Sequence, residues 1–256
     1  MPGGRTGRPD PMRNIRLLIE YDGTNYHGWQ IQPNGITVQE VLEKNLAIMT
    51  RQRVRLVGSG RTDAGVHALG QVANFQTSAS IPLKGFHRGL NSLLPPDIVI
   101  KSVEEAAADF NAQLLAKRKT YLYTILNREI PSAVHRNYSW HCPIPLNVES
   151  LQVSAQLLVG KKNFASFQAA DADTGNPIRE VFRADWFAGE APFLCFAIEA
   201  EGFLKQMVRN IVGTLVDVGR GKISIEEFER ILKAKDRRQA KMTAPPQGLF
   251  LMKVEY

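Results

Sequence analysis

The segment GSGRTDAGVHALGQVANF, residues 58–75, holds the residue types in this chain that are best suited to chemistry. Asp63 follows Arg61 by two positions in a glycine-rich stretch that leads into an apolar run. Side chains two positions apart in an extended backbone project to the same side, so we expect the Arg61 guanidinium to pair with the Asp63 carboxylate. An aspartate is ordinarily ionised at neutral pH, which suits a nucleophile or a charge-stabilising group better than a general acid. The alternative is an aspartate that only caps a turn.

Several other kinds of site are excluded by pattern. The phosphate-binding pattern GxxxxGK[ST] is absent, the third glycine of GxGxxG is missing, and the zinc-deaminase signatures His-x-Glu and Pro-Cys-x-x-Cys do not occur. The two cysteines, Cys142 and Cys195, are far apart in the sequence and have no CxxC partner. The sequence therefore predicts no metal site, no cofactor and no disulfide framework, and it places both cysteines in the core.

The chain is basic, with a formal net charge of +7 at pH 7. Its basic residues occur in short groups, which are Arg51, Arg53 and Arg55; Lys117, Arg118 and Lys119; and Lys233, Lys235, Arg237, Arg238 and Lys241. Such groups favour a nucleic-acid partner, because each phosphate that they neutralise releases counterions. If residues 54–57 form a strand, the arginines of the first group alternate onto one face just upstream of the segment 58–75. The alternative is a basic surface that only contacts solvent.

Hydrophobic spacing predicts the elements that must position these residues. In the first half we expect strands at 15–21, 54–57, 71–75 and 98–103, a helix at 38–49, and a second helix between Pro82 and Pro95. Thr37 and Glu40 form a capping box at the start of the first helix. In the second half we expect strands at 120–126, 181–187, 194–200 and 249–255 and helices at 149–158 and 203–218, followed by a helix capped by Ser224.

Both halves therefore have the order βαββαβ, which predicts an α+β fold made of two tandem ferredoxin-like units. We expect a disordered tail at residues 1–13 and units at residues 14–112 and 113–256, with residues 160–178 as a long functional loop. No apolar stretch reaches the roughly 18 to 20 residues that a membrane helix requires, and the N-terminus lacks the apolar centre of a signal peptide. We therefore expect a cytoplasmic protein.

Segments along most of the chain resemble the tRNA pseudouridine synthase A family. GSGRTDAGVHALGQ is similar to that family's active-site motif, and IEYDGTNYHGWQIQPNGITVQEVLE to its N-terminal signature. FNAQLLAKRKTYLYTI resembles its F-x-A-x-x-x-A-x-x-K-x-Y-x-Y segment, while GFLKQMVRNIVGTLVDVGRGK and TAPPQGLFLMKVEY resemble its two C-terminal motifs. These segments occur in order with similar spacing. One departure is Lys205 and Gln206, which stand where the family often has Tyr and His.

The resemblance implies the pseudouridine synthase fold, a mixed or antiparallel sheet with a central cleft. It also implies an isomerase that converts uridine to pseudouridine at positions 38, 39 and 40 of the tRNA anticodon stem-loop. In this reaction the uracil is detached from C1′, turned in the pocket and rejoined through C5. The family further implies a homodimer that needs neither metal nor cofactor.

The resemblance assigns roles to five residues. Asp63 is the expected catalytic carboxylate, and the route, by attack on C1′ or C6 or through a glycal, stays open. Arg61 is expected to pair with Asp63 and to help displace the target base, because a stacked base is out of reach. Tyr121 would stack on the uracil and help remove the C5 proton, Arg209 would be a second partner of Asp63, and Leu249 would pack against the uracil.

The alternatives to these roles are structural. Tyr121 and Leu249 also fit ordinary core positions of strands, and Arg209 also fits an exposed charge on its helix. His67 and Arg179 match family positions, and we expect them to have structural or RNA-contact roles. The rival function is an RNA-binding module without catalysis, although the RNP pattern of such modules is absent. A tRNA chaperone role beside catalysis is a further alternative.

Overall fold

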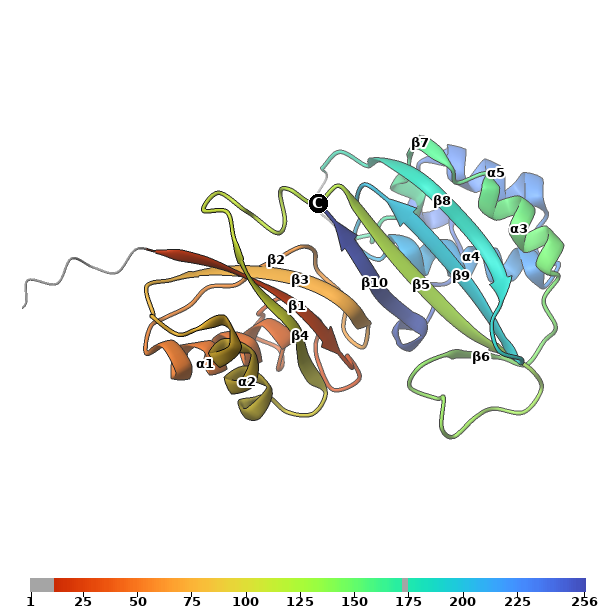
Figure 1. Cartoon of the computed structure of the whole chain (residues 1–256). Helices are drawn as coiled ribbons and strands as arrows, with labels where there is room; N and C mark the ends of the chain where they lie inside the picture. Colours follow the sequence, from red (N-terminus) through yellow and green to blue (C-terminus); the bar gives the residue numbers. More distant parts are fainter. Residues whose placement is uncertain (1–11, 172–174) are drawn as a thin grey trace, which may run out of the picture.

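Two βαββαβ units follow one another in the structure, a computed structural model that describes residues 12–171 and 175–256 (Figure 1). The first unit contains β1 (Arg13–Tyr21), α1 (Val38–Thr50), β2 (Val57–Gly58), β3 (His67–Thr77), α2 (Leu83–Leu93) and β4 (Ile98–Ala106). The second unit contains β5 (Arg118–Asn127), α3 (Val148–Gln156), β8 (Ile178–Ala188), β9 (Phe193–Ala200), α4 (Met207–Gly219) and β10 (Leu249–Glu255). This order confirms the predicted tandem α+β fold.

The strands of both units lie in one mixed sheet. The order β4-β1-β3, with β2 beside β3, is repeated as β10-β5-β9-β8, so each unit has the strand order 4-1-3-2 of a ferredoxin-like fold. The two units are joined where β10 pairs in parallel with β3, with Phe250 opposite His67 and Leu251 opposite Ala68. We call this junction the β3–β10 seam. In Figure 1, β10 (dark blue) lies between β3 and β5.

The second unit carries additions that the sequence patterns did not reveal. These are β6 (Trp140–Cys142), β7 (Gly160–Asn163), and three 3-10 turns, η1 (Ala165–Phe167), η2 (Arg237–Gln239) and η3 (Pro246–Gly248). The expected α5 (Ile225–Ala234) is present, and Ser224 accepts a hydrogen bond from the Glu227 N–H. The prediction of a long loop at 160–178 is wrong in its first part, because Phe164 and Phe167 are fully buried and fix β7 and η1 against the core.

Two predicted boundaries also differ from the structure. The strand expected at 54–57 is reduced to β2, because the Leu56 N–H donates to Glu43 Oε1 on α1 (2.9 Å) instead of to a neighbouring strand. The helix expected from residue 203 begins at Met207, since Gln206 has φ 60° and cannot belong to a right-handed helix. The expected tail lies outside the described residues up to residue 11, and Arg13 already belongs to β1.

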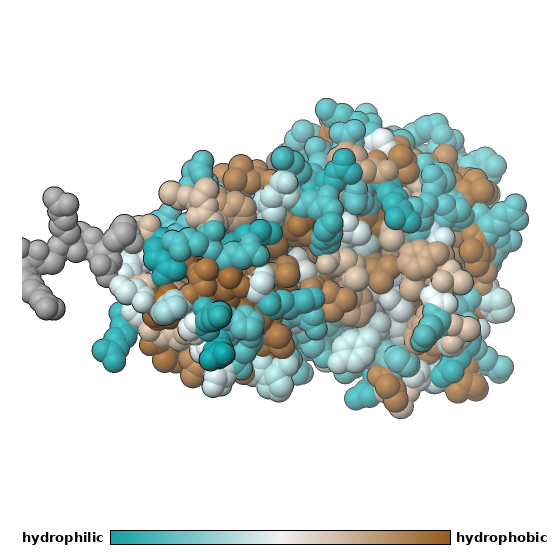
Figure 2. Space-filling model, in the orientation of Figure 1, coloured by the Kyte–Doolittle hydropathy of each residue, from teal (hydrophilic) through white to brown (hydrophobic). Residues whose placement is uncertain are grey.

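A single hydrophobic core runs through both units, and it contains Ile15, Leu42 and Phe75 from the first and Phe196 and Leu215 from the second. Both cysteines are buried, as expected. On the face shown in Figure 2, hydrophobic residues lie in groups separated by hydrophilic ones. In the described part of the chain, the helices are all too short or too polar to cross a membrane.

Candidate active site

Asp63 lies in the loop between β2 and β3, residues 59–66, which we call the Asp63 loop. Four backbone hydrogen bonds hold this loop. The Trp29 N–H donates to the Thr62 carbonyl and the Ser59 N–H to the Val72 carbonyl, while the Gly65 N–H donates to the Tyr26 carbonyl and the Val66 N–H to the Asp63 carbonyl. Gly28 has φ +86°, and a Cβ there would overlap the Thr62 carbonyl oxygen. The backbone of residues 26–29 therefore packs directly against the backbone of the Asp63 loop and supports it.

Arg209, on α4 of the second unit, is the ion-pair partner of Asp63. Its Nη1 lies 2.9 Å from Asp63 Oδ2, and the two side chains are 13% and 25% exposed. The Arg209 Nε donates to the Ala244 carbonyl (2.8 Å), and the Ala244 N–H donates to the Arg209 carbonyl (3.0 Å). Because the Ala244 carbonyl holds the guanidinium at Nε, Nη1 has a fixed position from which it directs the carboxylate.

Arg61 does not occupy the expected position. Its side chain is exposed, and among the described residues Asp63 forms its ion pair with Arg209 and none with Arg61. The neighbouring Thr62 is buried, and its Oγ1 lies 2.7 Å from the Tyr21 hydroxyl, so the loop turns Arg61 outward. The predicted pairing of Arg61 with Asp63 is wrong, because the loop does not continue the regular alternation of a strand.

Tyr121 lies on β5, opposite Leu251 of β10, and is 7% exposed. Its ring meets Phe203 edge-on, with the ring centroids 5.0 Å apart. Burial raises the pKa of Tyr121, and the nearby negative charge of Asp63 raises it further. The hydroxyl is therefore neutral at physiological pH, so it is suited to donating a hydrogen bond or to relaying a proton.

Leu249 begins β10 opposite Tyr123 and is 5% exposed. The Tyr123 hydroxyl donates to the Pro245 carbonyl (2.7 Å), so the turn before β10 is tied to β5. A Cβ at Gly248 would lie 2.8 Å from the Tyr123 ring, which requires a glycine there. The apolar environment of Leu249 is therefore built by β5 and η3.

His67 is buried in the seam, opposite Phe250. Its ring stacks on Phe250, with centroids 4.7 Å apart. Burial lowers the pKa of His67, which favours a neutral ring in which Nδ1 accepts from the Gly23 N–H (3.0 Å) and Nε2–H donates to the Asn137 carbonyl (2.8 Å). In this state the approach of Asp22 Oδ1 to Nδ1, 3.1 Å, is not an ion pair.

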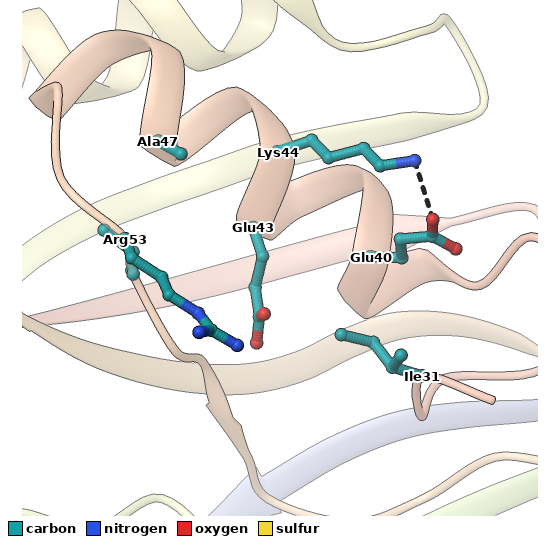
Figure 3. Close-up of a pocket in the computed structure, with 7 residues that line it drawn as sticks. Ile31, Glu40, Glu43, Lys44, Ala47 and Arg53 are labelled. Atoms are coloured by element: carbon teal, nitrogen blue, oxygen red, sulfur yellow. Dashed lines mark ion pairs between the residues drawn. The ribbon is translucent and has the colours of Figure 1, made fainter. Parts of the chain in front are cut away.

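A hollow beside α1 is lined by Ile31, Glu40, Glu43, Lys44, Ala47, Arg53 and Val54 (Figure 3). In Figure 3 the side chains of Arg53 and Glu43 point toward one another, and Lys44 pairs with Glu40. The Glu43 carboxylate accepts hydrogen bonds from the Leu56 N–H and the Gln39 side chain, so it holds the chain after α1. This hollow is therefore a structural feature of the first unit.

Arg53 and Arg55 are exposed, whereas Val54 and Leu56 between them are buried. The predicted alternation of the basic group therefore holds for these two arginines. Arg51 differs, because it is the C-cap of α1 with φ 56°. In the described part of the chain, no group of three or more His, Cys, Asp or Glu side chains is placed to hold a metal ion.

Fold and site together define a two-unit α+β protein with an arginine-held carboxylate at the junction of its units. A family model described as tRNA pseudouridine synthase matches residues 17–113 and 154–256. A "tRNA pseudouridine synthase A" of Thermoanaerobacter sp. (strain X514) is 49% identical over 245 residues, covering 96% of this chain and 100% of that protein. One from Geobacter sp. (strain M21) is 47% identical over 246 residues, covering 96% and 99%. The chain belongs to the tRNA pseudouridine synthase family.

Proposed function

We propose that this chain is a tRNA pseudouridine synthase that isomerises uridine at positions 38, 39 and 40 of the anticodon stem-loop, with Asp63 as the reacting carboxylate. Family membership supports the reaction and the tRNA substrate. The observation that supports the choice of Asp63 is its ion pair with Arg209, which aims a partly exposed carboxylate from the seam of the two units. The net charge of +7 suits a polyanionic substrate.

The reaction is an isomerisation, so its atoms balance without an added reactant. The bond from C1′ to N1 breaks, the bond from C1′ to C5 forms, the C5 proton is lost, and N1 gains a proton. In this scheme Asp63 assists the departure of the uracil, by attack on C1′ or C6 or by a glycal route. Tyr121, which is buried and close enough to feel the Asp63 charge, helps remove the C5 proton.

Arg61, which is exposed beside Asp63, contacts the displaced strand and helps keep the target base out of the stack. Leu249 supplies an apolar surface for the uracil at the start of β10. We further propose that the protein acts in the cytoplasm as a homodimer in which both protomers contact one tRNA. A mass measurement in solution tests the homodimer, and a monomer at working concentrations would contradict it.

The decisive test follows tritium at uracil C5. We expect the wild-type chain to release tritium from tRNA labelled at this position, and Asp63→Asn to bind the tRNA without release. Wild type that releases none would contradict the proposed function, and Asp63→Asn that releases tritium at the wild-type rate would contradict the role of Asp63. Mapping pseudouridines in the product tests the three positions. A chain that binds tRNA and leaves it unmodified would favour the RNA-binding module.

A further inference from the structure

Lys119, on β5, holds the start of the Asp63 loop across the boundary between the two units. Its Nζ donates a 2.6 Å hydrogen bond to the Ser59 carbonyl. A Cβ at Gly60 would lie 3.0 Å from the same Nζ, so the ammonium group lies against the loop backbone there. An ammonium group has three N–H donors, and this contact uses one of them.

The charge of Lys119 has no carboxylate partner among the residues that the structure describes. Its neighbour on the same strand, Arg118, points to the opposite face and pairs with Glu199 at 3.0 Å. Lys119 shares its face with Tyr121, two positions further along β5. A partly buried cation that meets only a carbonyl is not neutralised, and this one lies on the Tyr121 side of the sheet.

A second cation, Arg179, lies nearby at the start of β8. In the sheet, Lys119 pairs with Ala200 of β9, and Ala200 pairs with Val181 of β8. Arg179 precedes Val181 by two residues, and its Nε lies 3.8 Å from the place of a Cβ on Gly202. Its Nη1 donates to the carbonyls of Asn176 and Ile178. In the described part of the chain, Arg179 also has no carboxylate partner.

The two cations act on each other. Burial lowers the pKa of Lys119, and the positive charge of Arg179 lowers it further. Two unneutralised cations beside one another are unfavourable unless an anion lies between them, because like charges repel most strongly where water is scarce. Guanidinium and ammonium groups are also the side chains that bind phosphate oxygens most strongly.

We propose that Lys119 and Arg179 together bind one phosphodiester group of the RNA strand that carries the target uridine, beside Ser59 and Gly60 of the Asp63 loop. This inference rests on the proposed function, since it requires RNA at the Asp63 site. It adds a phosphate site to that function. Through the Ser59 carbonyl, the same lysine holds the loop, so the bound phosphate and Asp63 are kept at a fixed separation.

The test is the salt dependence of tRNA binding, measured in an Asp63→Asn background so that the uridine stays unmodified. Each phosphate contact contributes about 0.7 to 0.9 to the slope of log K against log salt concentration. We expect Lys119→Met and Arg179→Met each to reduce the slope by about that amount, and the double variant to reduce it no further, because the phosphate is bound only when both cations are present and is lost with either one. Lys119→Arg should keep the wild-type slope.

Lys44→Met is the matched control, because Lys44 carries the same charge but already pairs with Glu40 on α1 at 2.6 Å. It should leave the slope unchanged. Unchanged slopes in both single variants, a double-variant loss equal to the sum of two, or an equal loss in Lys44→Met would each overturn the proposal. Thermal unfolding checks that the variants fold. If Lys119→Met does not fold, the slope of Arg179→Met alone tests the proposal, and an unchanged slope in that variant would overturn it.

The outcome is separable from the proposed function. If the wild-type chain releases tritium and the slopes of the variants are unchanged, the proposed phosphate site is wrong and the proposed synthase function still stands. Reduced slopes in the variants, combined with no tritium release by the wild type, would contradict the synthase and leave an RNA-phosphate site.

Discussion

Arg209 Nη1 lies 2.9 Å from Asp63 Oδ2, and this ion pair joins α4 of the second unit to the loop of the first. Arg209→Met removes the pair and leaves the Ala244 carbonyl without the Nε donor. A misplaced reacting group can cost about 100-fold in rate, so we expect kcat for tritium release to fall by about that factor. Arg209→Lys keeps the charge but loses the two-sided contact and should recover only part of the rate.

The control for this prediction is Arg61→Met, which removes an exposed arginine from the same loop without touching the ion pair. We expect it to weaken tRNA binding while Asp63 stays held by Arg209. If Arg209→Met has wild-type kcat, the aiming role of Arg209 is wrong.

Stability at alkaline pH reports on Tyr121, because burial raises its pKa in the folded chain. In the unfolded chain a tyrosine loses its proton near pH 10, at a pH where the folded chain still holds it. Above that pH the unfolded state binds fewer protons, so stability falls as pH rises. Tyr121→Phe should make the decline of the unfolding free energy above pH 10 shallower by about 1.4 kcal/mol per pH unit. Urea denaturation at several pH values measures this slope, and an unchanged slope would contradict it.

Gly28 is the position where a single methyl group should disturb the Asp63 loop. Gly28→Ala places a Cβ against the Thr62 carbonyl at φ +86°, so either the loop or the supporting segment must move. Gly221→Ala is the control, since Gly221 has φ +69° and open space around it, and it should cost only about 1 kcal/mol of backbone strain. We expect Gly28→Ala to lose more stability and most activity. Equal effects of Gly28→Ala and Gly221→Ala on the melting temperature and on tritium release would contradict this prediction.

Leu249 and Leu251 separate a packing role from a substrate role on the same strand. Both are buried on one face of β10, at 5% and 0% exposure. Either change to Ala should lower the unfolding free energy by about 2 to 5 kcal/mol. If Leu249 contacts the uracil, Leu249→Ala should also raise KM several-fold beyond Leu251→Ala. Equal KM values for the two variants would make Leu249 an ordinary core residue.

The fold could be predicted because each pattern on which it depends is local. The bounds of β10 at 249–255, the start of α1 at Val38 and the cap at Ser224 follow from alternation and capping, which involve neighbouring residues. The strand at 54–57 was overestimated because its backbone bonds to Glu43 on α1, a contact between segments that no local pattern reports.

The site was predictable only in part, for the same reason. Spacing indicates Asp63 as a residue of interest, but it predicts an ion pair with Arg61, two positions away in the sequence. In the structure the Asp63 carboxylate forms its ion pair with Arg209. The helix pattern shows that Arg209 lies outside the apolar face of its helix, but only the resemblance to the family indicates Asp63 as its partner. The support of Thr62 by the Tyr21 hydroxyl was missed, because Tyr21 reads as the last residue of an ordinary strand.

The β3–β10 seam has a consequence for how the chain is made. Residues 67 and 68 can pair with β10 only after residues 250 and 251 have been synthesised. Part of the β3 edge therefore has no strand partner while most of the protein is still being made. Unpaired edges attract other chains, and β2 covers only the stretch opposite Ala73 and Asn74. The β3–β10 seam, which joins the two units in the finished protein, is thus also a surface through which a half-finished chain is exposed to aggregation.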